Sequence, residues 1–228
     1  MADIQKQSFL IRTFLVILII LQIVLVATVY PISAFQGYLA YPKIYLSNAF
    51  GQDPTRPIAS FILPISAFII ALVVSHRLYC LHALLKTSRD RRLWRFLVAA
   101  TAICCLGLLG VAAVSVSVLQ ILHWIVSALF FLAAIAIIIL FTAIDDSMKL
   151  DRPNWLRTLR IFFCVSSVIS GILFSLSAKV SPLASGIGEI LVSMLAVAYL
   201  TTFAHSSSFP IQCVKPLLSP RQPDRGIS

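Results

Sequence analysis

The feature that most constrains this chain is a set of six apolar runs, each long enough to cross a lipid bilayer. A helix needs roughly 20 residues to span a hydrocarbon core of about 30 Å. Backbone groups inside lipid must bond within their own segment, so these runs are predicted to be helices. The composition agrees, because 60% of the 228 residues are hydrophobic and 11% are charged. The sequence therefore predicts an all-α, polytopic membrane protein with spans near residues 13–34, 57–75, 96–118, 121–144, 158–178 and 184–204.

The basic residues predict how these helices are oriented. Cytoplasmic loops of membrane proteins are enriched in Lys and Arg. With the N-terminus in the cytoplasm, 15 of the 18 Lys and Arg residues fall in predicted cytoplasmic segments, and only Lys43, Arg56 and Lys179 are lumenal. Both termini are therefore predicted to be cytoplasmic. The net charge of +10 marks topology on this interpretation, so we expect no nucleic-acid partner.

The chain is predicted to form one transmembrane domain over residues 1–205, followed by a disordered cytoplasmic tail over residues 206–228 that contains four prolines. The longest lumenal segment covers residues 36–56 and is rich in Tyr, Gly and Pro. The four histidines form no pattern that indicates a metal site, and nothing in the sequence points to a cofactor. Membrane lipids are the expected partners, and the oligomeric state is left open.

The most informative polar residue is Glu189, the one acid inside a predicted span. It lies about 7–8 Å past Ala184 along the last helix, on the lumenal side. An ionisable residue at such a depth indicates a functional site, and it normally faces the interior of the bundle. His123 begins the fourth predicted helix at the same side of the membrane. Two hypotheses follow: the pair fixes helix packing, or it lines a lumenal pocket and acts on a lipid headgroup as acid and base.

The cytoplasmic segment "LLKTSRDRRLWRF" is the most basic part of the chain. Arg89, Arg91 and Arg92 are therefore candidate ligands for anionic lipid headgroups, since each juxtamembrane Arg contributes about 1 kcal/mol near an anionic surface. The alternative is that these residues only enforce topology.

Three stretches resemble a known superfamily of six-span proteins. They are "YPKIYLSNAFGQDPTR" before the second helix, "ILHWIVSALFFLAAI" at the start of the fourth, and "SGIGEILVSMLAVAYLTTFAH" in the sixth. This order resembles the superfamily of the damage-regulated autophagy modulators (DRAM), the FGF-receptor-activating protein and the post-GPI-attachment factors. Position by position, the resemblance selects Ser47, Gly51, Pro54, His123, Glu189 and Thr202.

The resemblance implies a role in lipid or GPI-anchor handling at the Golgi or ER. Asn48 stands where the autophagy branch typically has Asp, so "SNAFG" followed by Pro and Arg is closer to the GPI-factor branch. The expected substrate-binding residues are Ser47, Asn48, Gly51, Pro54 and Arg56. Whether the chain is an enzyme is left open, with His123 and Glu189 as the catalytic candidates. Two alternatives are a regulator or scaffold in autophagy or phosphoinositide signalling, and a small proton-coupled transporter.

Overall fold

The computed structural model describes residues 2–39, 45–50, 52–114, 119–148, 153–177 and 180–205. Within these ranges the chain is helical and contains no strand. Six helices are long and apolar enough to cross a membrane, which confirms the predicted all-α, six-span fold. The elements in chain order are α1 (Ala2–Phe35), α2 (Leu46–Phe50), α3 (Thr55–His82), α4 (Ser88–Ala113), α5 (Gln120–Ser147), α6 (Asn154–Ser177), α7 (Pro182–Thr201) and the 3₁₀ helix η1 (Thr202–His205).

Several helices extend past the predicted apolar runs. The third span was predicted to start at residue 96, and α4 begins at Ser88; the second was predicted to end at residue 75, and α3 continues to His82. Polar residues continue a helix where no breaker intervenes, so the hydrophobic length underestimates the helical length. The predicted tail at 206–228, together with Gly51 and Lys179, lies outside the described residues.

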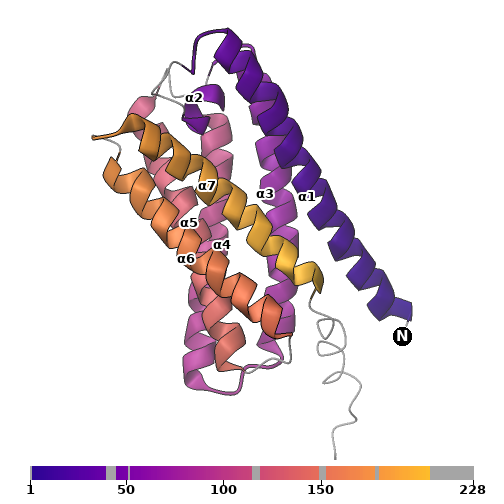
Figure 1. Ribbon diagram of the computed structural model, residues 1–228. Helices are drawn as coiled ribbons and strands as arrows, with labels where there is room; N and C mark the ends of the chain where they lie inside the picture. Colours follow the sequence, from indigo (N-terminus) through magenta and orange to yellow (C-terminus); the bar gives the residue numbers. More distant parts are fainter. Residues whose placement is uncertain are drawn as a thin grey trace, which may run out of the picture.

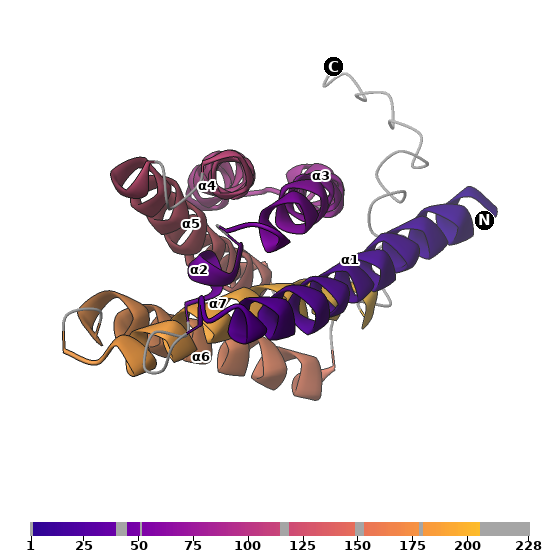
Figure 2. The same ribbon diagram turned by 90° about the horizontal axis from the view of Figure 1, so that it is seen from above.

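Two helical hairpins form the main body of the bundle. The α4–α5 pair and the α6–α7 pair each pack closely, α3 packs against α4, and α1 packs against α3 (Figures 1 and 2). Glycines make this proximity possible. A Cβ atom at Gly107 would lie 2.7 Å from the backbone nitrogen of Phe130. A Cβ atom at Gly188 would lie 2.6 Å from the backbone nitrogen of Phe174. Without side chains at these two positions, the paired backbones can approach.

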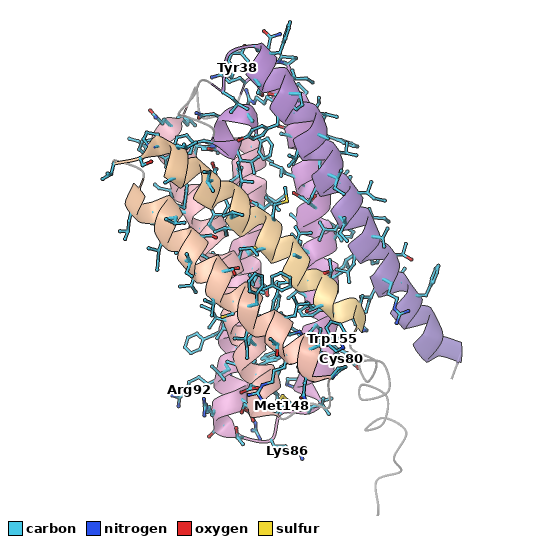
Figure 3. All side chains as sticks on the ribbon, viewed as in Figure 1. Tyr38, Cys80, Lys86, Arg92, Met148 and Trp155 are labelled. Carbon is cyan, nitrogen blue, oxygen red and sulfur yellow. The ribbon has the colours of Figure 1, made fainter. Side chains whose placement is uncertain are left out.

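The bundle has two distinct ends. At one end lie exposed Lys86, in the turn from α3 to α4, and exposed Arg92, near the start of α4, and we call this the basic end (Figure 3). At the other end, the short helix α2 lies close to α1, α3 and α7 (Figure 1). We call this the α2 end; it is the side that the charge distribution predicts to be lumenal. The helix α2 lies within a segment for which the sequence predicted no helix.

Candidate functional site

Glu189 is buried at the α2 end and binds the backbone of α2. The Leu46 N–H donates to Glu189 Oε2 over 2.8 Å, and the Ser47 N–H donates to Oε1 over 3.2 Å. The Ser47 hydroxyl lies against the same carboxylate. Only 3% of Glu189 is exposed. The carboxylate thus supplies acceptors for two N–H groups at the start of a helix, which have no partners within the helix itself.

Side chains from α1 and α3 hold the other end of α2. The Ala49 carbonyl accepts from Thr55 Oγ1 over 2.6 Å and from Ser33 Oγ over 2.9 Å. Ala49 and Phe50 are buried, so α2 also has an apolar face against the bundle. The position of Ser47 beside Glu189 is therefore determined by contacts from three transmembrane helices.

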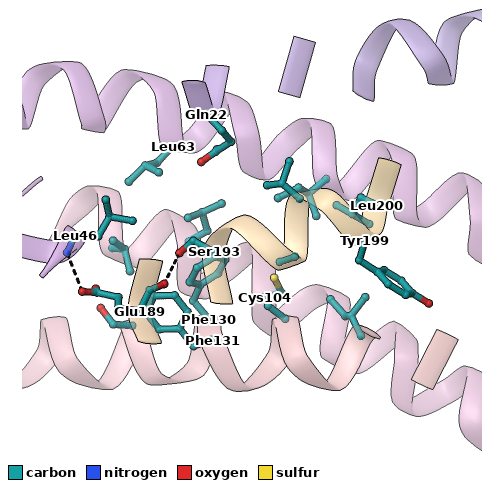
Figure 4. Close-up of a pocket in the computed structure, with 18 of the residues that line it drawn as sticks. Gln22, Leu46, Leu63, Cys104, Phe130, Phe131, Glu189, Ser193, Tyr199 and Leu200 are labelled. Atoms are coloured by element: carbon teal, nitrogen blue, oxygen red, sulfur yellow. Dashed lines mark hydrogen bonds between the residues drawn. The ribbon is translucent and has the colours of Figure 1, made fainter. Parts of the chain in front are cut away.

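A cavity of about 70 Å³ runs from Glu189 toward the middle of the bundle (Figure 4). Its polar lining near α2 comes from Ser47, Ser127, Glu189 and Ser193. Glu189 and Leu46 lie at one end of the pocket, and Tyr199 and Leu200 lie at the other. Apolar side chains make up most of the remaining wall: Phe50, Leu63, Ile70, Val74, Leu108, Val111, Phe130, Phe131, Ala134, Ile137, Ile138, Ala196, Val197 and Leu200.

The length of this cavity can be read from the helices that line it. Lining residues extend from Leu63 to Val74 on α3, from Ser127 to Ile138 on α5, and from Glu189 to Leu200 on α7. Each interval covers about 16 Å at 1.5 Å per residue. That is about half of a 30 Å hydrocarbon core. The cavity therefore has a polar end at Glu189 and an apolar length close to the depth of one leaflet.

His123 is buried near the start of α5, and its bonded nitrogen is directed at the backbone of α4. Its Nδ1 lies 2.7 Å from the carbonyl oxygen of Val114, the residue that ends α4. Its Nε2 is buried and has no hydrogen-bond partner among the described residues. No hydrogen bond in the described part of the chain joins His123 to Glu189. His123 therefore connects α4 to α5, and an acid–base pair with Glu189 stays a prediction.

The other predicted substrate-binding residues are spread around the α2 end. Ser47 lines the cavity. Asn48 and Arg56 are half-buried, and Pro54 is exposed immediately before α3. Of the five residues predicted to bind substrate, the structure places Ser47 beside Glu189. Gly51 lies outside the described ranges. A binding role for this group stays a prediction.

A second buried polar cluster lies toward the basic end, and the sequence interpretation missed it. Asp145 on α5 forms ion pairs with Arg77 of α3, over 2.8 Å, and with Arg160 of α6. The Arg160 guanidinium also donates to Thr202 Oγ1 over 2.9 Å. The guanidinium carbons of Arg77 and Arg160 lie 5.6 and 5.5 Å from the centroid of the Phe203 ring. The cluster thus joins four helical segments.

This cluster corrects two sequence interpretations. Arg77 and Arg160 had been counted as cytoplasmic topology markers, but each is at least 97% buried within a spanning helix. Asp145 had been placed just past the fourth predicted span, which made Glu189 the one acid inside a helix. The helix α5 continues to Ser147, and Asp145 is 1% exposed. The available signal was the helical spacing of Asp145 from Phe141 on the same buried face.

Thr202, which the family resemblance selected together with Glu189, belongs to this second cluster. It lies at the basic end, where the turn from α7 into η1 places its hydroxyl beside Arg160. Most of α7 separates Thr202 from Glu189, so the structure does not bring Thr202 to the Glu189 site. Its contact with a buried guanidinium gives it a clear packing role.

Arg89, Arg91 and Arg92 occupy the first turns of α4 rather than a loop, and all three are exposed. A capping box begins this helix. Thr87 Oγ1 accepts the Asp90 N–H over 3.1 Å and donates to Asp90 Oδ2 over 2.7 Å. Ser147 of α5 donates to the other Asp90 oxygen over 2.8 Å. The three arginines are thus displayed on a helix start that is anchored to α5.

Comparison with known proteins identifies a family. The family described as the Frag1/DRAM/Sfk1/Cwh43P N-terminal domain matches residues 6–205, which includes all six spans. No curated protein and no solved structure matches the chain. The family match agrees with the resemblance found in the three sequence stretches, and it covers both buried clusters. Among the described residues, no group of three or more His, Cys, Asp or Glu side chains is placed to hold a metal ion.

Proposed function

The chain belongs to the Frag1/DRAM/Sfk1/Cwh43P N-terminal-domain family, and we propose that it handles lipid by taking an acyl chain into the cavity beside Glu189. The observation that carries this proposal is the polarity of the cavity, with a group of polar side chains near Glu189 and a mostly apolar wall along the remaining length. The two polar side chains in that wall, Gln22 and Tyr199, already have hydrogen-bond partners in Ser66 and Thr142. Ligand sites are mostly apolar with a few placed polar groups. A lipid has the same distribution of polarity, with its headgroup toward α2 and its chain toward the bilayer centre.

The finer form of the proposal is that the lipid belongs to a GPI anchor and that the protein acts in the Golgi or ER. The support is the stretch around Ser47 and Asn48, which resembles the GPI-factor branch more than the autophagy branch. The α2 end, predicted to face the lumen, is where an anchored molecule would present its lipid. Localisation of an N-terminally tagged copy at native expression tests the compartment, and a lysosomal or plasma-membrane location would contradict it.

Blocking the cavity tests the proposal directly. Ala196 lines the cavity, while Ala198 is similarly half-buried on α7 and is not among the lining residues. We expect Ala196→Phe to reduce crosslinking of a lipid with a photoactivatable acyl chain, and Ala198→Phe to leave it near the wild-type level. The crosslinked peptides should come from α3, α5 and α7. Equal crosslinking in both variants, or peptides only from lipid-facing surfaces, would contradict the proposal.

A second candidate function rests on the exposed arginines at the start of α4. Arg89, Arg91 and Arg92 lie together on an anchored helix start at the basic end. We propose that they bind anionic lipid headgroups there, which would suit a regulator or scaffold in phosphoinositide signalling or autophagy. This contact is separate from the cavity, so the two functions can be tested by different variants.

A further inference from the structure

We infer that the cavity selects an uncharged, single-chain lipid whose headgroup carries hydroxyl groups, as a monoacylglycerol does. This inference rests on the proposed uptake of an acyl chain beside Glu189 and specifies the ligand. It is an alternative to the GPI-anchor form of that proposal, because a GPI anchor carries a phosphate group. Three observations carry it: the acceptors available near Glu189, a buried hydroxyl without a partner at the same depth, and the narrowness of the cavity.

The first observation concerns acceptors. An ionised carboxylate has about four acceptor positions. The Leu46 and Ser47 N–H groups occupy two of those on Glu189, and the adjacent Ser47 hydroxyl can take a third. No Lys or Arg in the described part of the chain forms a salt bridge with Glu189. A ligand headgroup in this position therefore meets an acceptor, which favours a headgroup that donates and disfavours one, such as a carboxylate, that only accepts.

The second observation is Ser127, which lines the cavity from α5. It is 6% exposed, and its hydroxyl has no hydrogen-bond partner among the described residues. It lies seven residues past the start of α5, and Glu189 lies seven residues past the start of α7, so the two lie at about the same depth. A buried hydroxyl without a partner is costly and calls for an explanation. A headgroup between Ser127 and Glu189 would supply the missing partner.

His123 lies one helical turn from Ser127, but it is not among the residues that line the cavity. Because a carbonyl oxygen only accepts, the bond to Val114 requires that Nδ1 carry a proton. In the neutral ring, Nε2 is then an acceptor, and it has no partner in the described ranges. Within the cavity, a hydroxyl group can donate to Glu189 and also accept from Ser127, whereas an ammonium group only donates. Hydroxyls therefore suit this headgroup region better than an amine does.

The third observation is the size of the cavity. A single water needs about 10–15 Å³ by the same measure, so 70 Å³ corresponds to about five to seven such positions. Spread over about 16 Å, this space accommodates one extended chain and excludes a two-chain lipid. Phosphate would bring negative charge toward Glu189. An uncharged single-chain lipid satisfies both limits.

Competitive photolabelling of the purified full-length chain tests this inference. The probe is a monoacylglycerol with a photoactivatable group in its chain, and the competitors are unlabelled monoacylglycerol, fatty acid, lysophosphatidic acid and long-chain amine of equal chain length. We expect monoacylglycerol to compete at about tenfold lower concentration than the two anionic lipids. Equal or better competition by either anionic lipid or by the amine would overturn the headgroup assignment.

Three variants complete the test. We expect Ser127→Ala to lower labelling about fivefold and Glu189→Gln about tenfold, since each removes a hydrogen bond to the ligand. Ser60→Ala is the control, because Ser60 of α3 is not among the residues that line the cavity and its hydroxyl donates to the Ala112 carbonyl over 3.0 Å. Ser127→Ala removes no side-chain hydrogen bond that the described residues form, so it remains informative if Glu189→Gln disturbs α2. Unchanged labelling in Ser127→Ala would overturn the inference.

The experiment separates this inference from the proposed function. If the probe labels the cavity and the competitors displace it regardless of their headgroups, lipid binding stands and the headgroup assignment fails. If the probe labels no residue of the cavity, the proposed function fails as well.

Discussion

Leu46 donates its backbone N–H to Glu189 over 2.8 Å, which joins two residues that are 143 positions apart in the chain. This bond attaches the connection between the first two spans to the last span. It also places a carboxylate at the polar end of an apolar cavity. Glu189 is therefore both a structural acceptor for α2 and the carboxyl group that a ligand in the cavity would meet.

Replacing Glu189 with alanine should loosen α2. The N–H groups of Leu46 and Ser47 would lose their acceptor, and each buried group left without a partner costs about 1–3 kcal/mol. We expect a lower unfolding temperature and faster amide hydrogen exchange over residues 45–50. Glu189→Gln, which retains one acceptor oxygen, should have a smaller effect. Unchanged exchange over 45–50 in Glu189→Ala would show that α2 is held by other contacts.

Removing the charge of Asp145 should destabilise the protein more than any single surface change. Asp145→Asn leaves two buried arginines facing a neutral amide, and breaking a buried ion pair costs about 3–5 kcal/mol. The adjacent Asp146 gives a matched control, because its pair with Arg157 is about half exposed. Asp146→Asn should cost at most about 1 kcal/mol. Thermal unfolding in detergent measures both, and similar values for the two variants would contradict the assignment.

A side chain at Gly188 should separate α6 from α7. A Cβ there would lie 2.6 Å from the Phe174 nitrogen and 2.7 Å from the Ser170 carbonyl oxygen, and neither backbone can move freely. We expect Gly188→Ala to cost about 1–3 kcal/mol in the free energy of unfolding. At Gly171 the near atom is the end of the Ile135 side chain, which can rotate. Gly171→Ala should therefore cost less, and the reverse order would contradict the observed packing.

The arginines at the start of α4 should bind anionic lipid by charge. The triple change of Arg89, Arg91 and Arg92 to Gln should reduce the number of anionic lipids that remain bound, as counted by native mass spectrometry. Each residue is expected to contribute about 1 kcal/mol near an anionic surface. A triple change to Lys preserves charge and should retain binding, particularly at low salt. Loss of binding in the Lys variant would instead indicate a site that requires the guanidinium shape.

Much of the architecture could be predicted because the bilayer imposes it. Hydrophobic length predicted six spanning helices, and the structure has six helices that are long and apolar enough to cross a membrane. Glu189 could be selected in the same way, since a carboxylate inside an apolar run is costly wherever the helix packs. Hydrophobic length predicts the ends of helices less well. Asp145 was therefore placed outside its helix, although it lies within α5.

The partners of the polar residues could not be predicted. Glu189 and His123 share one end of the bundle, as the topology requires, but Glu189 binds Leu46 and Ser47 while His123 binds Val114. Arg77 and Arg160 looked like topology markers because a basic residue at a span boundary has the same sequence pattern whether it faces water or a buried acid.

The sequence by itself determined how many spanning helices this protein has, which end is basic, and that Glu189 would be buried. Those properties follow from the free energy of transferring side chains from water into the bilayer, which is set by the residues of each segment separately. The tertiary structure alone decided that α2 would bind Glu189, that Asp145 would join Arg77 to Arg160, and that a narrow cavity would extend from Glu189 to Tyr199. Those properties depend on which helices are neighbours and how each is rotated, and small residues such as Gly107 and Gly188 act on that packing only once the helices meet.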